Sequence, residues 1–163
     1  MKHLLKNWVT ILFTISLVAI IAALVAEFFF NLSPCNMCLK QRHPYYAIMI
    51  TTILFITLQK QKSIWLFIIN EFAIVYGLFY AVWHVGIEKK ILPGPASCSG
   101  SLSKTSSIQN LKEQISNQAV VNCTDIIWTI LGFSAATVNS ILLLLILIYN
   151  SIYIFNFYGP KKK

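Results

Sequence analysis

The chain has 163 residues, of which 57% are hydrophobic and only 11% are charged, and its mean hydropathy is +0.70. These values exclude an ordinary soluble domain and indicate an integral membrane protein. A net charge of +8 can suggest nucleic-acid binding, but the 13 Lys and Arg residues stand in short clusters between apolar runs. Membrane topology explains this arrangement better, so we expect no nucleic-acid partner.

Four apolar runs predict an all-α fold, an integral membrane four-helix bundle that forms one domain over residues 1–163. The expected spans are about 8–30, 41–58, 64–87 and 126–155, and crossing a bilayer takes about 20 residues. The first run is longer than the apolar region of a signal peptide, which has about 7–15 residues, so we interpret it as a retained helix. The second run reaches spanning length only when the helical turns from Cys38 to His43 are included.

Positive charges predict how these helices are oriented, because Lys and Arg favour the cytoplasmic side. Six cations lie on one side of the bundle, and four of them belong to the loop of about 88–125, where length weakens the rule. Seven lie on the other side: Lys2, Lys6, Lys60, Lys62, Lys161, Lys162 and Lys163. We therefore expect both termini in the cytoplasm and all the cysteines outside, where Lys40 and Arg42 oppose the local charge bias.

The long outer loop contains turn-forming residues and one helical pattern. Pro93-Gly94-Pro95 predicts turns. Farther along, apolar residues recur at spacings of three and four with polar residues between them: Ile108, Leu111, Ile115 and Ala119. This pattern predicts a short amphipathic helix, which either lies on the membrane surface or packs on the bundle.

The stretch from Pro34 to Cys38 stands in the gap between the first two apolar runs and contains a C-x-x-C motif. Such a pair can close a small disulfide ring, and a thiolate at the start of a helix is stabilised by unpaired N–H groups and the helix dipole. If the helix begins near Asn36, Cys38 lies in its first turn and Arg42 follows one turn later on the same face. This spacing predicts a permanent cation beside a reactive sulfur.

The four cysteines, Cys35, Cys38, Cys98 and Cys123, lie outside the centres of the apolar runs, and the sequence leaves their three possible pairings open. A close pair at the membrane edge and two loop cysteines are suited to passing a disulfide by thiolate attack. Outside the cytoplasm disulfides persist, so an oxidised partner is the expected product. The alternatives are a static disulfide in the motif and a staple that only restrains the loop.

Electrons taken from such a partner need an acceptor. The sequence contains no flavin fingerprint, and Leu39 after Cys38 excludes c-type haem attachment. A lipid-soluble quinone remains, and Arg42 can hydrogen-bond its carbonyl and stabilise developing negative charge. The alternative for Arg42 is a side chain that extends from a helix end to the interface.

Several motifs stand in a specific order along nearly the whole chain: the C-x-x-C after Pro34, Arg42 four residues beyond it, His84 near the outer end of the third run, Cys98 after a Pro-rich turn, and Cys123 with Trp128 five residues later. In this order and topology the chain resembles the disulfide bond formation protein B (DsbB) family, bacterial inner-membrane thiol oxidases. Each motif alone is modest, but their combination is specific.

The resemblance implies that Cys98–Cys123 oxidises a DsbA-like periplasmic thiol–disulfide oxidoreductase and that Cys35–Cys38 reoxidises this pair. It further implies that ubiquinone or menaquinone takes electrons from Cys38 beside Arg42, in the inner membrane. His84 is then expected near the quinone, or, as the alternative, it hydrogen-bonds a neighbour. The basic Lys40 leaves the electrostatics of the quinone site open, and we expect Trp128 to be an interfacial anchor.

Two other classes of function use the same residues. Four cysteines can bind structural zinc, but separations of 60 residues from Cys38 to Cys98 and 25 from Cys98 to Cys123 argue against a metal-stapled scaffold, so no metal is expected. A quinone reductase of the vitamin K epoxide reductase type has its C-x-x-C late in the chain, whereas here the motif comes first. Glu27 is either functional or simply reaches the interface, and the sequence assigns no role to Glu71.

Overall fold

The computed structural model describes residues 7–95, 98, 122–126, 128–130 and 132–159. Its elements, in chain order, are α2 (Trp8–Phe28), α3 (Asn36–Thr57), α4 (Ile64–Glu88), β1 (Thr129–Ile130), β2 (Phe133–Ser134) and α6 (Ala135–Tyr158). The expected all-α membrane bundle is thus confirmed, with one short antiparallel pair, β1 and β2, placed before the last helix.

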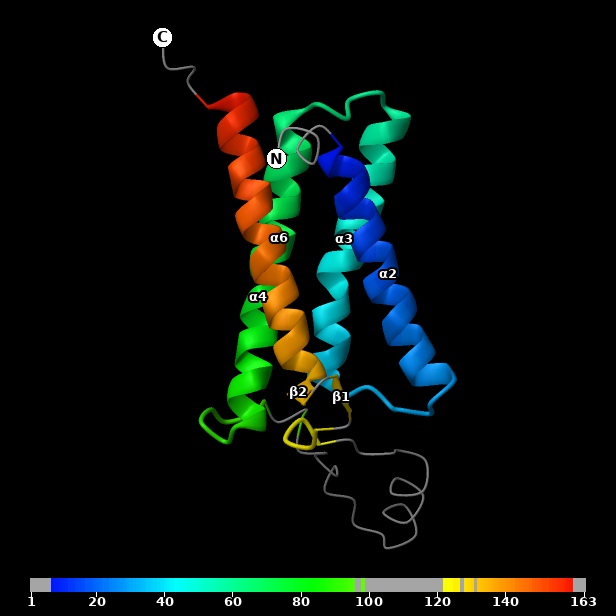
Figure 1. Ribbon diagram of the computed structural model, residues 1–163, viewed down its shortest axis with the longest axis vertical. Helices are drawn as coiled ribbons and strands as arrows, with labels where there is room; N and C mark the ends of the chain where they lie inside the picture. The colour runs from blue at the N-terminus through cyan, green and yellow to red at the C-terminus, as the bar shows by residue number, and fades with distance from the viewer. Residues whose placement is uncertain (1–6, 96–97, 99–121, 127, 131, 160–163) are drawn as a thin grey trace, which may run out of the picture.

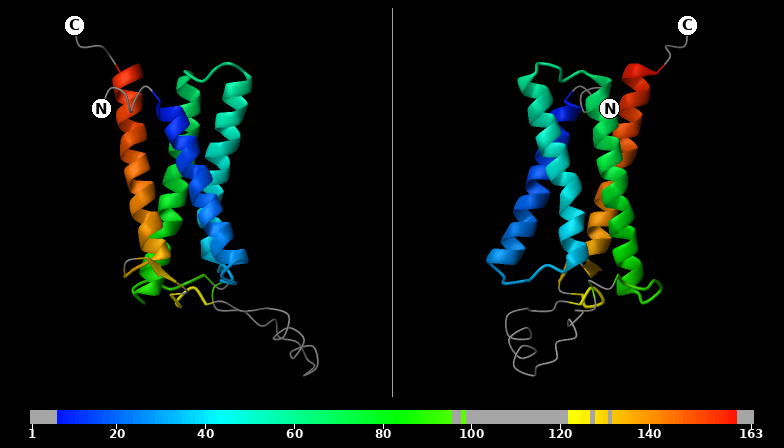
Figure 2. Two further views of the ribbon diagram at one scale, coloured as in Figure 1. Left: turned by 45° about the vertical axis from the view of Figure 1, so that its right-hand side comes forward. Right: turned by 180° about the vertical axis from the view of Figure 1, so that it is seen from behind.

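The helices run along one common direction (Figure 1). α3 packs against α2 and α4, and α4 packs against α6. The start of α2, the end of α6 and the α3–α4 turn lie at one end of the bundle, and β1 and β2 lie at the other (Figure 1). Helices α2 and α6 are joined near the first end by a hydrogen bond from Trp8 Nε1 to Asn150 Oδ1, of 3.1 Å. They diverge toward the other end (Figure 2).

Three of the described helices, α2, α4 and α6, are long and apolar enough to cross a membrane. α3 has 22 residues, but its first two turns contain the polar run Lys40-Gln41-Arg42-His43. Large hydrophobic side chains stay exposed along the bundle, such as Phe72 at 73% and Phe79 at 59%. Exposed apolar side chains of this size on long helices are suited to lipid contact. The chain is therefore a membrane protein.

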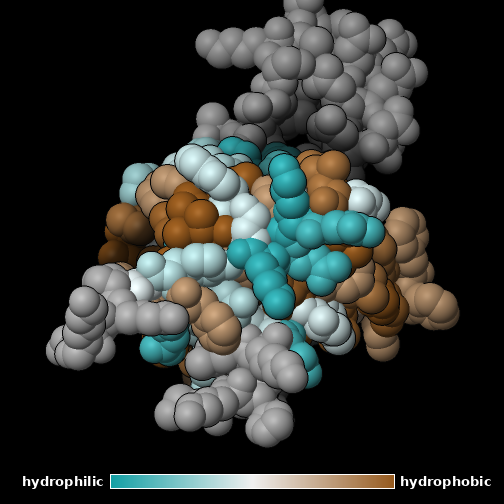
Figure 3. Space-filling view, turned by 90° about the horizontal axis from the view of Figure 1, so that it is seen from above, coloured by the Kyte–Doolittle hydropathy of each residue, from teal (hydrophilic) through white to brown (hydrophobic). Residues whose placement is uncertain are grey.

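The end of the bundle that contains the α3–α4 turn differs in character from its sides. Seen from above, hydrophilic residues gather over this end, and hydrophobic residues lie at its flanks (Figure 3). The turn itself contributes exposed polar residues, from Gln59 to Lys62. A polar end next to apolar sides matches a bundle whose helix ends reach the membrane surface.

α4 packs closely against α3 and α6 at Gly77. A Cβ on Gly77 of α4 would lie 2.5 Å from Pro44 Cγ and 3.2 Å from Leu143 Cδ1. Only a residue without a side chain fits this contact, because real Cβ atoms essentially never come so close to another atom. Around it lies a core of buried apolar side chains that includes Ile48, Phe67 and Ile74.

Polar side chains also join the helices inside the bundle. Asn150 of α6 donates from Nδ2 to the Phe67 carbonyl of α4 (3.1 Å) and to the Glu71 carboxylate. Ser151 donates to the other oxygen of Glu71, at 2.5 Å. Glu71 therefore has a structural role that the sequence did not reveal, since it ties α4 to α6 in a region where water is scarce.

The boundaries of two predicted segments require comment. The last helix begins at Ala135, not near Ile126, because Gly132 has φ +83° in the turn between β1 and β2 and Ser134 Oγ then caps α6 by accepting from the Thr137 N–H. The predicted amphipathic helix around Ile108 to Ala119 lies outside the described residues.

Candidate active site

Cys35 forms the N-cap of α3. Its backbone is extended, and its Sγ accepts a hydrogen bond from the backbone N–H of Cys38 at 3.2 Å, in the manner of an N-cap side chain. The two sulfur atoms lie 2.7 Å apart, and both cysteines are free. A disulfide bond measures about 2.05 Å, so a small movement is enough to close the ring.

The environment of Cys35 favours its thiolate. The hydrogen bond from the Cys38 side chain is the largest cause that lowers the Cys35 pKa below its ordinary value. Burial acts in the opposite direction, and the hydrogen bond and charge of His84 and the Cys38 N–H lower the pKa further. The sequence predicted a reactive sulfur at a helix start, and the sulfur that receives the helix N–H is that of Cys35.

His84 reaches the motif from α4. Its Nε2 lies 3.7 Å from Cys35 Sγ, and its Nδ1 lies 2.8 Å from Gln41 Nε2. The ring is 4% exposed, and Cys35 is 3% exposed. A ring nitrogen of His84 also lies within 4.8 Å of the Cys123 sulfur. The ring is therefore bonded to the C-x-x-C helix and lies close to the second cysteine segment.

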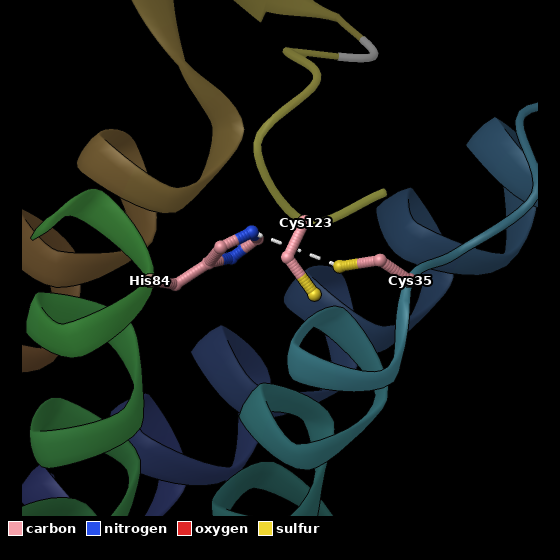
Figure 4. A group of neighbouring side chains, drawn as sticks. All are labelled: Cys35, His84 and Cys123. Carbon is pink, nitrogen blue, oxygen red and sulfur yellow. Dashed lines mark hydrogen bonds between the residues drawn. The ribbon is translucent and has the colours of Figure 1, made fainter. Parts of the chain in front are cut away.

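The second cysteine pair is joined, since Cys98 and Cys123 form a disulfide with a Cα–Cα distance of 5.2 Å. The Cys123 sulfur, the Cys35 sulfur and a ring nitrogen of His84 all lie within 4.8 Å of one another (Figure 4). Both loop cysteines are buried in a small cluster with Cys35 and Met37. The fold thus brings the two cysteine pairs together, as a disulfide relay requires.

A cavity of about 230 Å³ opens beside the motif. Its polar lining includes Cys38, Arg42 and His84, and Trp128 also lines it. Small alanine side chains of α2 and α6 form much of the remaining wall: Ala19, Ala22, Ala23, Ala26, Ala135 and Ala136. These small side chains leave room between the two helices that diverge at this end. Two carboxylates, Glu88 and Asp125, also line the cavity.

Arg42 lines the cavity but is held by α2. Its Nη1 donates to Glu27 Oε2 at 2.6 Å, and its Nη2 donates to the Ala23 carbonyl at 3.4 Å. Glu27, for which the sequence left two interpretations, is thus the counter-ion of Arg42. Lys40 does not line the cavity, and its Nζ lies 5.0 Å from the centre of the Tyr80 ring, a cation–π contact.

The sequence analysis missed three polar residues of the site. Gln41 bonds His84, Asn139 donates from Nδ2 to Gln41 Oε1 at 2.8 Å, and Tyr45 donates from its hydroxyl to Asn139 Oδ1 at 2.5 Å. A signal existed for Asn139, because an amide inside an apolar run is a candidate for function.

Comparison with known proteins agrees with the geometry. The family model described as "Disulfide bond formation protein DsbB" matches residues 5–153. The chain is 29% identical over 147 residues to the "Uncharacterized protein RP370" of Rickettsia prowazekii (strain Madrid E). The aligned residues make up 89% of this chain and 85% of that protein. No solved structure matches the chain. The chain belongs to the DsbB family, and it is a membrane oxidoreductase that forms disulfide bonds and works with a thiol–disulfide oxidoreductase partner.

Proposed function

We propose that this protein is a thiol oxidase of the bacterial inner membrane that reoxidises a DsbA-like periplasmic dithiol protein and passes the electrons to ubiquinone or menaquinone. The observation that supports it most strongly is the contact between the two cysteine pairs, with the Cys123 and Cys35 sulfurs within 4.8 Å. Disulfide exchange needs a thiolate close to a disulfide sulfur, and this geometry provides it.

The outer pair receives the partner's electrons. A partner thiolate attacks Cys98, the Cys98–Cys123 bond breaks, and Cys123 leaves as a thiolate. The partner's second thiolate then attacks the mixed disulfide and frees Cys98. The partner gains a disulfide, and the outer pair gains two electrons, with two protons passing from partner thiols to enzyme thiols or water.

The inner pair then accepts these electrons. The Cys123 thiolate attacks Cys35 of an oxidised Cys35–Cys38 pair and expels Cys38. Cys98 attacks Cys123, which restores the outer disulfide and frees Cys35. The combination of a Cys98–Cys123 disulfide with free Cys35 and Cys38 corresponds to the stage after this transfer.

The cavity beside Cys38 fits a quinone head group. A cavity of about 150 Å³ is enough for a benzene ring, so about 230 Å³ leaves room for a substituted ring. Its apolar lining suits a lipid-soluble molecule, and Arg42 offers N–H donors for a carbonyl oxygen. A quinone, when bound, supplies an acceptor for two electrons and two protons.

The chain's own residues close the inner disulfide. The Cys35 thiolate, hydrogen-bonded by the Cys38 N–H and by His84, forms the new bond to the Cys38 sulfur. Two electrons and the protons of the dithiol leave in the same conversion. The guanidinium of Arg42, which pairs with Glu27, lines the cavity together with Cys38 and can stabilise negative charge there.

The proposed orientation places both chain ends in the cytoplasm and the cysteines in the periplasm. The start of α2, the end of α6 and the turn with Lys60 and Lys62 share one end of the bundle, and the cysteines lie at the other (Figures 1 and 4). The excess of positive charge at the first end supports this direction. An oxidising compartment on the cysteine side also suits a stable outer disulfide.

The competing metal scaffold has some geometric basis, because Cys35, Cys123 and His84 form a compact group of buried ligand types. Zinc binds cysteine as the thiolate, however, and Cys123 is engaged in a disulfide with Cys98. The Cys98–Cys123 disulfide would have to break before this group could bind metal, so the group is better suited to disulfide exchange.

The test is anaerobic mixing of the purified protein with a reduced DsbA-like partner and a soluble quinone analogue, with quinone absorbance followed over time. We expect quinol equal to the partner disulfide formed. Cys35→Ser and Cys38→Ser should abolish quinone reduction, and Cys98→Ser and Cys123→Ser should leave the inner disulfide intact but stop turnover with the partner. Turnover in any single variant, or zinc retained by purified protein without quinone reduction, would contradict the proposal.

A further inference from the structure

Four hydrogen bonds form an unbroken chain from Tyr45 to the Cys35 sulfur. In order, the chain links Tyr45 Oη, the Asn139 amide, the Gln41 amide, the His84 ring and Cys35 Sγ, with separations of 2.5, 2.8, 2.8 and 3.7 Å. It passes from α3 to α6, back to α3, then to α4 and to the N-cap of α3. Among the described residues, Tyr45, Asn139 and Gln41 make no hydrogen bond to a cysteine, so the disulfide relay does not account for their position.

The two amides set the donor-to-acceptor direction of this chain of hydrogen bonds. The Gln41 oxygen accepts from Asn139 Nδ2, so the Gln41 nitrogen faces His84. An amide nitrogen can only donate. His84 Nδ1 is therefore the acceptor, and in the neutral ring the proton resides on Nε2, the atom that faces Cys35 Sγ.

We propose that Gln41, Asn139 and Tyr45 are positioning residues that hold His84 in its Nε2–H tautomer, so that the ring donates a hydrogen bond to the Cys35 thiolate. In the other tautomer Nε2 would turn a lone pair toward the anionic sulfur and repel it. This inference rests on the proposed function, in which the Cys35 thiolate closes the inner disulfide. It adds three residues to the site, none of which contacts the reacting sulfurs.

Burial explains why this chain of hydrogen bonds favours one tautomer of His84. Gln41, His84, Cys35 and Tyr45 are each less than 10% exposed, so an unsatisfied donor or acceptor among them loses water without gaining a partner. Reversing either amide alone would place two oxygens or two nitrogens of Asn139 and Gln41 against each other, so the bond between them is lost unless both reverse. The tautomer of His84 is thus coupled to an amide of α6 through Gln41.

Charged and titratable groups from every neighbouring element face this part of the site. They are Cys38 and Arg42 on α3, Glu27 on α2 through its pairing with Arg42, Glu88 on α4, and Asp125 in the segment before β1. A charge near the ring acts on both ring nitrogens together. The amide chain differs, because it determines which nitrogen holds the proton.

The decisive variant is Asn139→Asp, which keeps the size of the side chain but removes its donor. A carboxylate accepts only, so the Gln41 nitrogen should turn toward it and the Gln41 oxygen toward His84. The ring must then hold its proton on Nδ1. Asn139→Leu removes both partners and leaves Gln41 free to keep its direction, so it should disturb His84 less. A purely structural role for Asn139 predicts the reverse order.

The measurement is ¹⁵N NMR of histidine-labelled full-length protein, in which His84→Asn identifies the His84 signals among the three histidines of the chain. We expect Nε2–H in the native protein and Nδ1–H in Asn139→Asp. Gln41→Glu, which places a carboxylate directly on Nδ1, gives a second route to a protonated Nδ1 if the first variant does not fold. Asn70→Asp is the matched control, because it adds the same charge at a buried amide of α4 that bonds Thr51.

Reactivity of Cys35 provides the second measurement. In a Cys38→Ser background, where Cys35 is the free thiol, Asn139→Asp should move the midpoint of the pH profile for alkylation by iodoacetamide upward by about one pH unit, the effect of one lost hydrogen bond to a charged group. An unprotonated Nδ1 in Asn139→Asp, or an unchanged pH profile of Cys35 alkylation, would overturn the inference. Neither measurement involves quinone or partner, so failure here is distinct from failure of the proposed oxidase activity.

Discussion

Arg42 and Glu27 form an ion pair of 2.6 Å that joins α3 to α2 at the edge of the cavity. Their side chains are 14% and 27% exposed, so the pair is only partly screened by solvent. Nη2 of Arg42 is held in addition by the Ala23 carbonyl. Glu27 therefore determines where the guanidinium stands and how much of its charge reaches a bound molecule.

Replacing Glu27 should weaken quinone use without affecting thiol exchange. In Glu27→Ala the Arg42 side chain loses its anchor, and we expect the apparent KM for a soluble quinone analogue to rise about two- to fivefold, as for a partly exposed ion pair. Glu27→Gln retains a hydrogen-bond acceptor and should show a smaller rise. Steady-state kinetics at varied quinone concentration measure both, and equal KM values in all three proteins would remove Glu27 from the site.

Glu27 acts through Arg42, so their variants should not be additive. Arg42→His should weaken quinone use while the cysteines still exchange disulfides. The double variant Glu27→Ala/Arg42→His should then be little worse than Arg42→His alone, because the contact is already lost. A double-mutant cycle on apparent KM measures this coupling, and simple multiplication of the two single effects would show that the residues act independently.

The contact between the cysteine pairs predicts a specific cross-link. In Cys38→Ser/Cys98→Ser the two remaining cysteines are Cys35 and Cys123, whose sulfurs lie within 4.8 Å in the native protein. Mild oxidation should join them, and peptide mass spectrometry detects the product. Exchange between the pairs proceeds through this bond.

The matched control for this cross-link is Cys35→Ser/Cys98→Ser, which leaves Cys38 and Cys123. Cys38 lies in the first turn of α3 and is not part of the close group with His84. We expect slower formation of its disulfide with Cys123. Equal rates in the two double variants would mean that the pairing of Cys123 with Cys35 is not set by the fold.

Gly77 should be sensitive to the smallest possible substitution. A Cβ there meets Pro44 Cγ at 2.5 Å, so Gly77→Ala forces α3 and α4 apart and should cost about 1–3 kcal/mol of stability. Val75→Ala, at a side chain of α4 that is 49% exposed, should have little effect. Thermal unfolding in detergent measures the difference, and equal stability of the two variants would show that the helices accommodate the extra methyl group.

Much of the fold could be predicted because its signals are local. α2 and α4 begin at Trp8 and Ile64, where apolar runs begin, and α3 begins at Asn36, just after Cys35. The start of α6 was predicted too early, since residues such as Ile126 and Trp128 continue the apolar composition. There the turn at Gly132 and the cap at Ser134 override hydrophobicity.

The sequence by itself determined the membrane class of this protein, its helical segments, its four cysteines and the position of Arg42 one turn after Cys38. These features depend on composition and on spacing within one helix. Tertiary structure alone decided that His84 meets Cys35 and that Asn139 bonds Gln41, across separations of 49 and 98 residues. Helical periodicity defines the faces of a helix, but packing between helices decides which faces meet, because that choice depends on contacts such as Gly77 on Pro44.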